Sequence, residues 1–189
     1  MELVANRIAM ARALAADVII MHTGTAPEGQ DQAFWQQLRR SLDALQPAAR
    51  ERGVRIAIEN GTWPLIRAIL AVYPPDYVGV CYDSGHGNLG WGSLDELAAD
   101  KDRLISVHLH DNDGSADQHK LPFTGTVPWP RLAGIIAHSA YAKCVNLETV
   151  MRNTGTQDEA AFLAQAFEAG VRLSRMIDEQ RLMQTAQSA

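Results

Sequence analysis

The chain has 189 residues, of which 47% are hydrophobic and 21% are charged, a composition typical of a globular protein that buries a substantial core. Its 17 Lys and Arg residues are outnumbered by 22 Asp and Glu residues, which gives a net charge of -5. An acidic balance offers no basic field to a phosphate backbone, so we expect no nucleic-acid partner. The N-terminus lacks a hydrophobic leader and no run approaches the roughly 18 apolar residues of a membrane span, so we expect a cytoplasmic protein without a membrane partner.

Helix-like segments alternate with five short apolar runs along the chain. The first helix is expected over residues 4–16, which are rich in Ala, and the second over 31–52, where apolar residues recur at helical spacing and Pro47 is expected to kink or shift the helix. Ser93 followed by Glu96 has the spacing of a capping box, which predicts that a helix begins there. The other helices are expected over 62–72, 93–99, 129–139 and 158–180, and the apolar runs are 18–22, 54–59, 78–83, 104–108 and 144–148.

The five apolar runs read as the strands of repeated βα units. They are short, rich in β-branched residues, and followed by Gly, Asn or Thr before the next helical stretch, a pattern that predicts an α/β fold with a parallel sheet. Each run ends on a chelating or acidic residue: His22, Glu59, Asp83, His108 and Glu148. The carboxyl ends of parallel strands meet at one face, where active sites form, so five such ends together predict one site. For any single one of them, a solvated loop position remains the alternative.

The alternation within the runs separates two faces. Positions counted back by two from the terminal residues are small or polar, as at Ala57, Cys81 and Ser106, whereas the other phase is bulky and apolar. Successive strand side chains point to opposite faces, so the bulky phase is expected to pack under helices and the small phase to line the interior of a curved sheet. Cys81 and Cys144 both fall inside runs, and we interpret them as reduced core residues rather than disulfide partners.

Four motifs follow one another in the chain, and their ordered set carries a resemblance. They are Val54-Arg-Ile-Ala-Ile-Glu59-Asn60, Asp83-Ser-Gly-His86, His108-Leu-His-Asp111-Asn112, and Asp117-Gln-His119 followed by Gly125 and Trp129. From about Ala5 to about Ile177 the chain resembles the xylose-isomerase-like TIM-barrel superfamily. That group includes sugar and sugar-phosphate isomerases and epimerases and the metal-dependent AP endonucleases, so the resemblance implies a (β/α)8 TIM-barrel type of fold.

The resemblance also implies a metal site. Its four positions that hold one divalent metal in the epimerases match Glu59, Asp83, His108 and Glu148. His110 is an alternative to His108, because the two lie two residues apart and would share a face. The superfamily places its ligand three residues before an acid, as in His108-Leu-His-Asp111, so we favour His108.

Further matches concern substrate or a second metal. His86 matches a residue that touches substrate in the epimerases and binds a second metal in the endonucleases, and Asp117, His119 and His22 match extra metal positions of the endonucleases. His110 belongs with these candidates. The plainer alternatives are a turn residue satisfied by the backbone for His86, and a packing role for His22.

The chemistry of the four matched ligands can be argued from their side chains. Three carboxylates and an imidazole suit Mn²⁺, Mg²⁺, Co²⁺ or Zn²⁺. Such a metal polarises a carbonyl or hydroxyl and lowers the cost of an enediolate when a neighbouring carbon loses its proton. Glu59 and Glu148 come from different strands, so each could serve one face of a planar intermediate as general base or acid, and the resemblance points to the same catalytic pair. Gly114 stands where the epimerases have an arginine six residues after the histidine ligand, which leaves the substrate open.

The number of expected strands is lower than a closed barrel requires. A (β/α)8 barrel has eight strands and typically about 250 residues, whereas the sequence predicts about five βα units, which by register would be strands four to eight. We therefore expect a single TIM-barrel-type domain over residues 1–184 that lacks its N-terminal units, and a frayed tail over 185–189. Open sheet edges favour association, so a homo-oligomer is one way to cover them.

Three functions remain in view. The leading hypothesis is a divalent-metal-dependent sugar or sugar-phosphate isomerase or epimerase with a small sugar substrate. A rival is a metal-dependent phosphodiesterase of the AP-endonuclease type, favoured by the extra His and Asp matches and opposed by the acidic balance. The third is a catalytically inactive barrel fragment that keeps the ligands.

Overall fold

The computed structural model describes residues 2–24, 28–29 and 31–187. The chain divides into two compact units, Met1–Val80 and Cys81–Ala189, and strand β3 (Val78–Asp83) runs from the first into the second. Within the described ranges, no helix combines the length and the apolar character that crossing a membrane requires.

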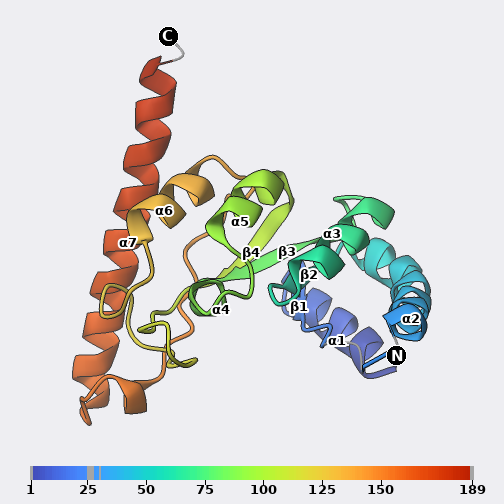
Figure 1. The fold of residues 1–189 in the computed structure, drawn as a ribbon, viewed down its shortest axis with the longest axis horizontal. Coiled ribbons are helices and arrows are strands. Elements are labelled where there is room, and N and C mark those ends of the chain that lie inside the picture. Colours follow the sequence, from blue (N-terminus) through green and yellow to red (C-terminus); the bar gives the residue numbers. More distant parts are fainter. Residues whose placement is uncertain (1, 25–27, 30, 188–189) are drawn as a thin grey trace. The chain divides into compact units, whose positions relative to one another are not determined.

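The first unit contains two βα pairs and the start of β3 (Figure 1). Its elements are α1 (Glu2–Ala13), β1 (Val18–Met21), α2 (Asp31–Arg52), β2 (Arg55–Glu59) and α3 (Trp63–Val72). β1 and β2 are parallel, with Val18 opposite Arg55 and Met21 opposite Ile58. The backbone N–H of Ile56 donates to the carbonyl of Tyr77 at 2.9 Å, so the hydrogen-bonded order in this unit is β1-β2-β3.

Helix α2 supplies much of the apolar core of the first unit. Leu38, Leu42 and Leu45 are buried along one face of it, at the helical spacing that the sequence shows. Pro47 lies inside α2 and does not end it. The strand β2 is likewise buried, with Ile56, Ala57 and Ile58 fully inaccessible to solvent.

The second unit begins with the end of β3, and β4 continues the sheet from it. Its further elements are α4 (Ser84–Asn88), α5 (Leu94–Asp100), η1 (Lys101–Arg103), β4 (Leu104–His108), α6 (Trp129–Ala137), η2 (Met151–Asn153) and α7 (Glu159–Gln187). α6 packs along the long helix α7 (Figure 1). The predicted capping box is present, because Ser93 Oγ accepts from the N–H of Glu96 and the Glu96 carboxylate accepts from the N–H of Ser93.

The fifth strand predicted from the sequence, over 144–148, does not form. Only Leu147 makes a parallel bridge, to Leu109, through hydrogen bonds from Leu109 N–H to Asn146 and from Glu148 N–H to Leu109. A strand is stabilised by backbone hydrogen bonds to neighbouring strands. Within the described residues, the segment 144–148 makes such bonds on one side only, to Leu109. Cys144, which we expected in the core, is therefore exposed, whereas Cys81 is buried.

The helix boundaries differ slightly from those predicted. α1 ends at Ala13 rather than 16, and α6 ends at Ala137 rather than 139. α7 reaches Gln187, so its backbone extends into the predicted tail 185–189, and residues 188–189 lie outside the described part of the chain. The tail and the single domain over 1–184 stay predictions.

Candidate active site

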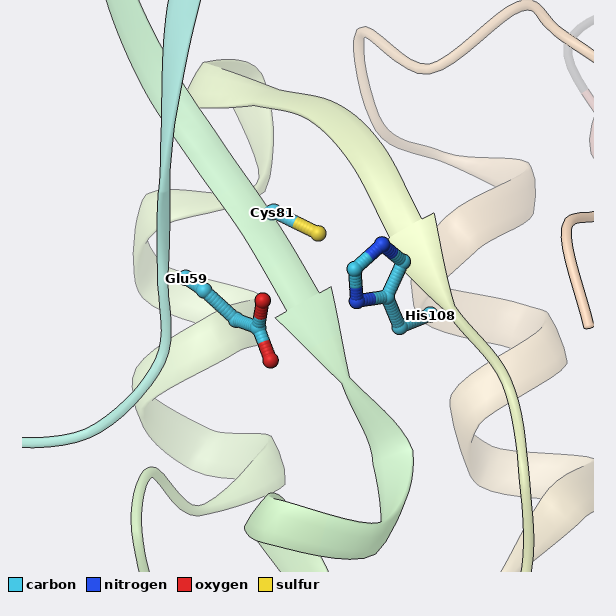
Figure 2. Close-up of side chains that lie close together, drawn as sticks. All are labelled: Glu59, Cys81 and His108. Atoms are coloured by element: carbon cyan, nitrogen blue, oxygen red, sulfur yellow. The ribbon is translucent and has the colours of Figure 1, made fainter. Parts of the chain in front are cut away.

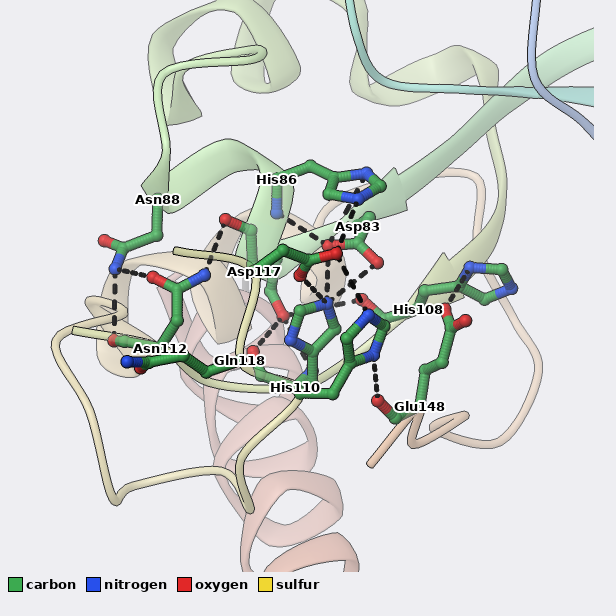
Figure 3. A network of polar contacts seen from close by, with 12 residues as sticks. Asp83, His86, Asn88, His108, His110, Asn112, Asp117, Gln118 and Glu148 are labelled. Carbon is green, nitrogen blue, oxygen red and sulfur yellow. Dashed lines mark hydrogen bonds and ion pairs between the residues drawn. The ribbon is translucent and has the colours of Figure 1, made fainter. Parts of the chain in front are cut away.

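Three of the predicted metal ligands come together in the second unit. Asp83 ends β3, His108 ends β4, and Glu148 follows the bridge at Leu147. One donor atom from each of Asp83, His108 and Glu148 lies within 4.8 Å of the others. His108 Nδ1 and Glu148 Oε2 are 2.6 Å apart (Figure 3). Two strand ends and one bridge thus bring an acid, an imidazole and an acid close together, and their role as metal ligands stays a prediction.

The first unit holds the other two strand-end candidates. Glu59 ends β2 with a carboxylate that is 2% exposed, and His22 follows β1. His22 Nε2 lies 3.1 Å from Glu59 Oε2, so these two residues form a pair within their own unit. The side chain of His22 is 69% exposed, and its assignment as a substrate or second-metal residue stays a prediction.

Cys81 lies beside the cluster of the second unit. It precedes Asp83 by two residues on β3 and is fully buried, in the inward phase that the alternation predicts. A donor atom of His108 lies within 4.8 Å of its sulfur. Figure 2 shows Cys81 on β3 and His108 at the end of β4, and also labels Glu59 at the end of β2.

Asp83 is a fully buried carboxylate with a defined set of donors. Its Oδ1 accepts the backbone N–H of His86 at 2.7 Å, which makes Asp83 the N-cap of α4. His110 Nε2 lies 3.0 Å from Oδ1 and 3.1 Å from Oδ2. A carboxylate removed from water is costly unless it is paired and hydrogen-bonded, so these contacts explain how Asp83 is kept in place inside the protein.

His110 is 0% exposed, and its ring packs directly against Gly85. A Cβ at Gly85 would lie 1.9 Å from His110 Cε1, so only glycine fits there. Burial alone lowers the pKa of His110, but the hydrogen bond and charge of Asp83, together with the charge of Asp117, outweigh it and raise the pKa above its ordinary value. The His110 ring therefore interacts most strongly with the Asp83 carboxylate.

A second cluster of titratable groups gathers around Asp117. Its carboxylate lies 3.1 Å from His119 Nε2 and 3.6 Å from His86 Nε2, and 3.7 Å from His110 Nε2. His110 and His119 stack with ring centroids 4.0 Å apart and an interplanar angle of 13°. All of the predicted substrate or second-metal residues except His22 are thus neighbours in the second unit, and Figure 3 labels His86, His110 and Asp117 among them.

The tautomer of His119 determines which of its ring nitrogens faces Asp117. His119 Nδ1 lies 2.8 Å from the backbone carbonyl of Glu148, which can only accept, so Nδ1 carries the proton. In the neutral ring, Nε2 then presents a lone pair toward Asp117 Oδ2 at 3.1 Å. Two acceptors at this distance repel each other, and a metal cation between them would relieve that repulsion.

Asp111 of the His108-Leu-His-Asp111 motif is structural. It is fully buried, and its carboxylate accepts the N–H groups of Asn112 at 2.9 Å and Val127 at 3.1 Å and the indole N–H of Trp129 at 2.8 Å. These bonds close the loop over 112–128 that carries Asp117 and His119. The role of Asp111 was not predicted from the sequence, where it served only as a spacing marker.

Asn112 connects this loop to α4. Its amide N–H donates to the carbonyl of Gly85 at 2.9 Å, and its side-chain oxygen accepts from Asn88 at 2.7 Å (Figure 3). Gly125 closes against the same backbone, because a Cβ there would lie 2.2 Å from the carbonyl oxygen of Asn112. The roles of Asn88 and Gly85 were not predicted, because a glycine or a short polar residue after a strand is only weak evidence of a functional position.

The donor chemistry of Asp83, His108 and Glu148 fits a divalent cation. Two carboxylates that approach the same imidazole repel each other in the absence of a positive charge, and a cation relieves that repulsion. Oxygen donors with one imidazole nitrogen suit Mg²⁺, Mn²⁺, Co²⁺ and Zn²⁺. Asp83, His108 and Glu148 are therefore the residues of the second unit that would hold the ion.

The chain is similar to several known proteins. The protein y4fM of Sinorhizobium fredii is 34% identical over 193 residues, which cover 95% of this chain and 62% of the relative. Among solved structures, L-ribulose 3-epimerase matches with a TM-score of 0.76 at 14% identity, over 100% of this chain and 70% of that one. The IOLI protein, described with a bound zinc atom, matches with a TM-score of 0.69 at 14% identity, over 93% of this chain and 68% of that one.

These matches confirm the predicted fold class, a TIM-barrel type with fewer βα units than a closed barrel. The chain spans less than two thirds of the length of its relative y4fM. A family model described as xylose isomerase-like TIM barrel matches residues 1–166. The chain therefore belongs to the xylose isomerase-like TIM barrel family.

Proposed function

We propose that this chain is part of a divalent-metal-dependent sugar or sugar-phosphate isomerase or epimerase. The observation that carries the proposal is the convergence of Asp83 and His108, at the ends of β3 and β4, with Glu148, which follows the bridge at Leu147, within 4.8 Å of one another. L-ribulose 3-epimerase, a structure of similar fold, is a sugar epimerase by its description, which supports this substrate class. That Glu59 supplies the fourth ligand stays a prediction from the resemblance.

The chemistry divides between the ion and the side chains. A divalent cation, when bound, supplies Lewis acidity to a carbonyl and an adjacent hydroxyl of the substrate. Glu148 is 43% exposed, so it is the carboxylate that a substrate entering from solution can reach, and we assign it the removal of the carbon-bound proton. His108, at 2.6 Å from Glu148, holds that carboxylate in one orientation. Glu59, which is 2% exposed, is the second acid or base of the predicted pair.

Exchange of a carbon-bound hydrogen with solvent tests this assignment. A proton taken by a carboxylate can pass into bulk water before it returns, so simple ketoses incubated in D₂O with Mg²⁺ or Mn²⁺ should incorporate deuterium, as measured by mass spectrometry. Glu148→Gln should abolish the incorporation. Glu159→Gln, an exposed acid in the first turn of α7, is the matched control and should leave it unchanged. Incorporation that survives Glu148→Gln would contradict the assigned role.

The cluster around Asp117 favours a second candidate, a phosphodiesterase of the AP-endonuclease type. Asp117 lies between His86 and His119, and the tautomer of His119 favours a cation there. The net charge of -5 weighs against a nucleic-acid substrate. Cleavage of duplex DNA with an abasic site, without deuterium incorporation into any sugar, would favour this candidate, since phosphodiester hydrolysis breaks no C–H bond.

A further inference from the structure

His110 contacts Asp83 more closely than it contacts any other carboxylate of the described residues. Its Nε2 lies 3.0 Å and 3.1 Å from the two oxygens of Asp83, compared with 3.7 Å from Asp117 Oδ1. Since a carboxylate accepts and does not donate, Nε2 carries the proton in this contact. The proton-bearing edge of the ring is therefore occupied by Asp83 (Figure 3).

The position of the His110 ring is fixed on three sides. Its backbone N–H donates to Ser84 Oγ at 2.9 Å, and Ser84 Oγ donates to the His110 carbonyl at 2.6 Å, which ties the segment after β4 to the first residue of α4. One part of the ring abuts Gly85, where a Cβ would lie 2.5 Å from Nδ1. His119 covers one ring face at 4.0 Å. A ring held in this way cannot turn away from Asp83.

The contact with Asp83 weighs against His110 as a ligand of the ion that Asp83, His108 and Glu148 would hold, although His110 also belongs to a group with Asp117 and His119 that could hold a cation. A cation at Nε2 would have to displace the hydrogen bond to Asp83. The Nδ1 of His108, two residues earlier, lies 2.6 Å from Glu148, which the resemblance also matches to a metal ligand. The two histidines of the motif therefore contact different carboxylates, although they lie only two residues apart.

We propose that His110 is a positioning residue, which holds the Asp83 carboxylate in the orientation that metal binding requires without touching the metal. This inference rests on the metal site of the proposed function. Asp83 is a short side chain whose two oxygens can rotate, and the donors from His86 N–H and His110 Nε2 fix that rotation. Partners that orient a ligand in this way typically contribute about 10-fold to 100-fold in metal affinity.

Metal affinity in two matched variants tests the proposal. His110→Gln can keep an N–H donor toward Asp83, whereas His110→Met has a similar length and no donor. The Kd for Zn²⁺ is measured by competition with a chromophoric chelator, and the stability of each metal-free protein is measured by urea unfolding. We expect His110→Met to bind Zn²⁺ about 10-fold to 100-fold more weakly and His110→Gln to bind it nearly as wild type does.

A second pair of variants displaces the ring without replacing it. Gly85→Ala forces its Cβ into His110, whereas Gly87→Ala in the same short helix meets the Tyr82 hydroxyl at 2.1 Å instead. Both variants change a crowded glycine of α4 to alanine, so they control for the general disturbance of that helix. Gly85→Ala should weaken Zn²⁺ binding, and Gly87→Ala should weaken it much less.

The outcomes separate this inference from the function on which it rests. Equal Zn²⁺ affinity in wild type and Asp83→Asn would overturn both the metal site and the role of His110. Affinity that depends on Asp83 but is unchanged in His110→Met would overturn the role of His110 alone. Equal losses in His110→Gln and His110→Met that follow the loss of metal-free stability would also overturn it, because a packing role predicts that result.

Discussion

The two units position their candidate residues in different ways. In the first unit, Glu59 ends a buried strand and meets the exposed His22 at 3.1 Å, over a core that consists of apolar side chains from α2 and β2. In the second unit, the polar residues Asp83, His110 and Asp111 are fully buried. The carboxylates of Asp83 and Asp111 accept backbone N–H groups, and the backbone N–H of His110 donates to a serine hydroxyl of α4. The difference indicates that buried polar contacts orient the acids and imidazoles of the second unit. In the first unit, the acid lies beside a core of apolar side chains.

The largest stability effect is expected at Asp111 in the second unit. Asp111→Ala leaves the N–H groups of Asn112, Val127 and Trp129 without their acceptor in the interior. Breaking a buried charged network in this way costs about 3–5 kcal/mol, measured as the free energy of unfolding in urea. Asp113→Ala removes an exposed carboxylate from the same loop and should cost much less. Similar losses in both variants would show that the loop is not held by Asp111.

In the first unit, the free energy of unfolding should depend most on the apolar core. Leu42 is fully buried on α2, so Leu42→Ala should cost about 2–5 kcal/mol through lost burial and a residual cavity. Glu59→Gln, which keeps the size of the side chain, should cost less than Leu42→Ala in the same urea unfolding experiment. If Glu59→Gln were the more damaging change, the contrast between the two units would be wrong.

A smaller effect is expected at the capping box of α5. Ser93→Ala removes the acceptor for the N–H of Glu96 and should cost about 1 kcal/mol. Thermal unfolding followed by circular dichroism measures the change, and Ser93→Asp, which can also cap a helix, should restore most of it. No recovery in Ser93→Asp would indicate that Ser93 stabilises the protein by some other contact.

Much of the fold and site could be predicted because the signals are local. β-Branched runs that end on Glu59, Asp83 and His108 coincide with strands, and Ser93 begins a helix as its capping box predicts. The segment ending at Glu148 failed as a strand, because a ladder depends on neighbours that a local pattern cannot reveal.

Longer-range roles were also beyond the sequence pattern. Asp111 accepts from Val127 and Trp129, which lie 16 and 18 residues later, so only the closed loop identifies it as a structural acid. Helix α4 was not predicted, since Gly85 and Gly87 are poor helix formers and the helix depends on Asp83 as its cap. Spacing within the resemblance favours His108 over His110 as the ligand, but the contact of His110 with Gly85 could not be predicted, because Gly85 comes from another element.

The most direct test of the central claim is elemental analysis of the protein after incubation with Zn²⁺ or Mn²⁺ and extensive dialysis. The proposed site predicts about one divalent ion per chain in wild type, and a clear loss in Asp83→Asn, because Asp83 is a buried donor of the cluster with His108 and Glu148. Because Glu59 is the predicted fourth ligand, Glu59→Gln should also lose metal. Unchanged stoichiometry in both variants would contradict the assignment of the metal site.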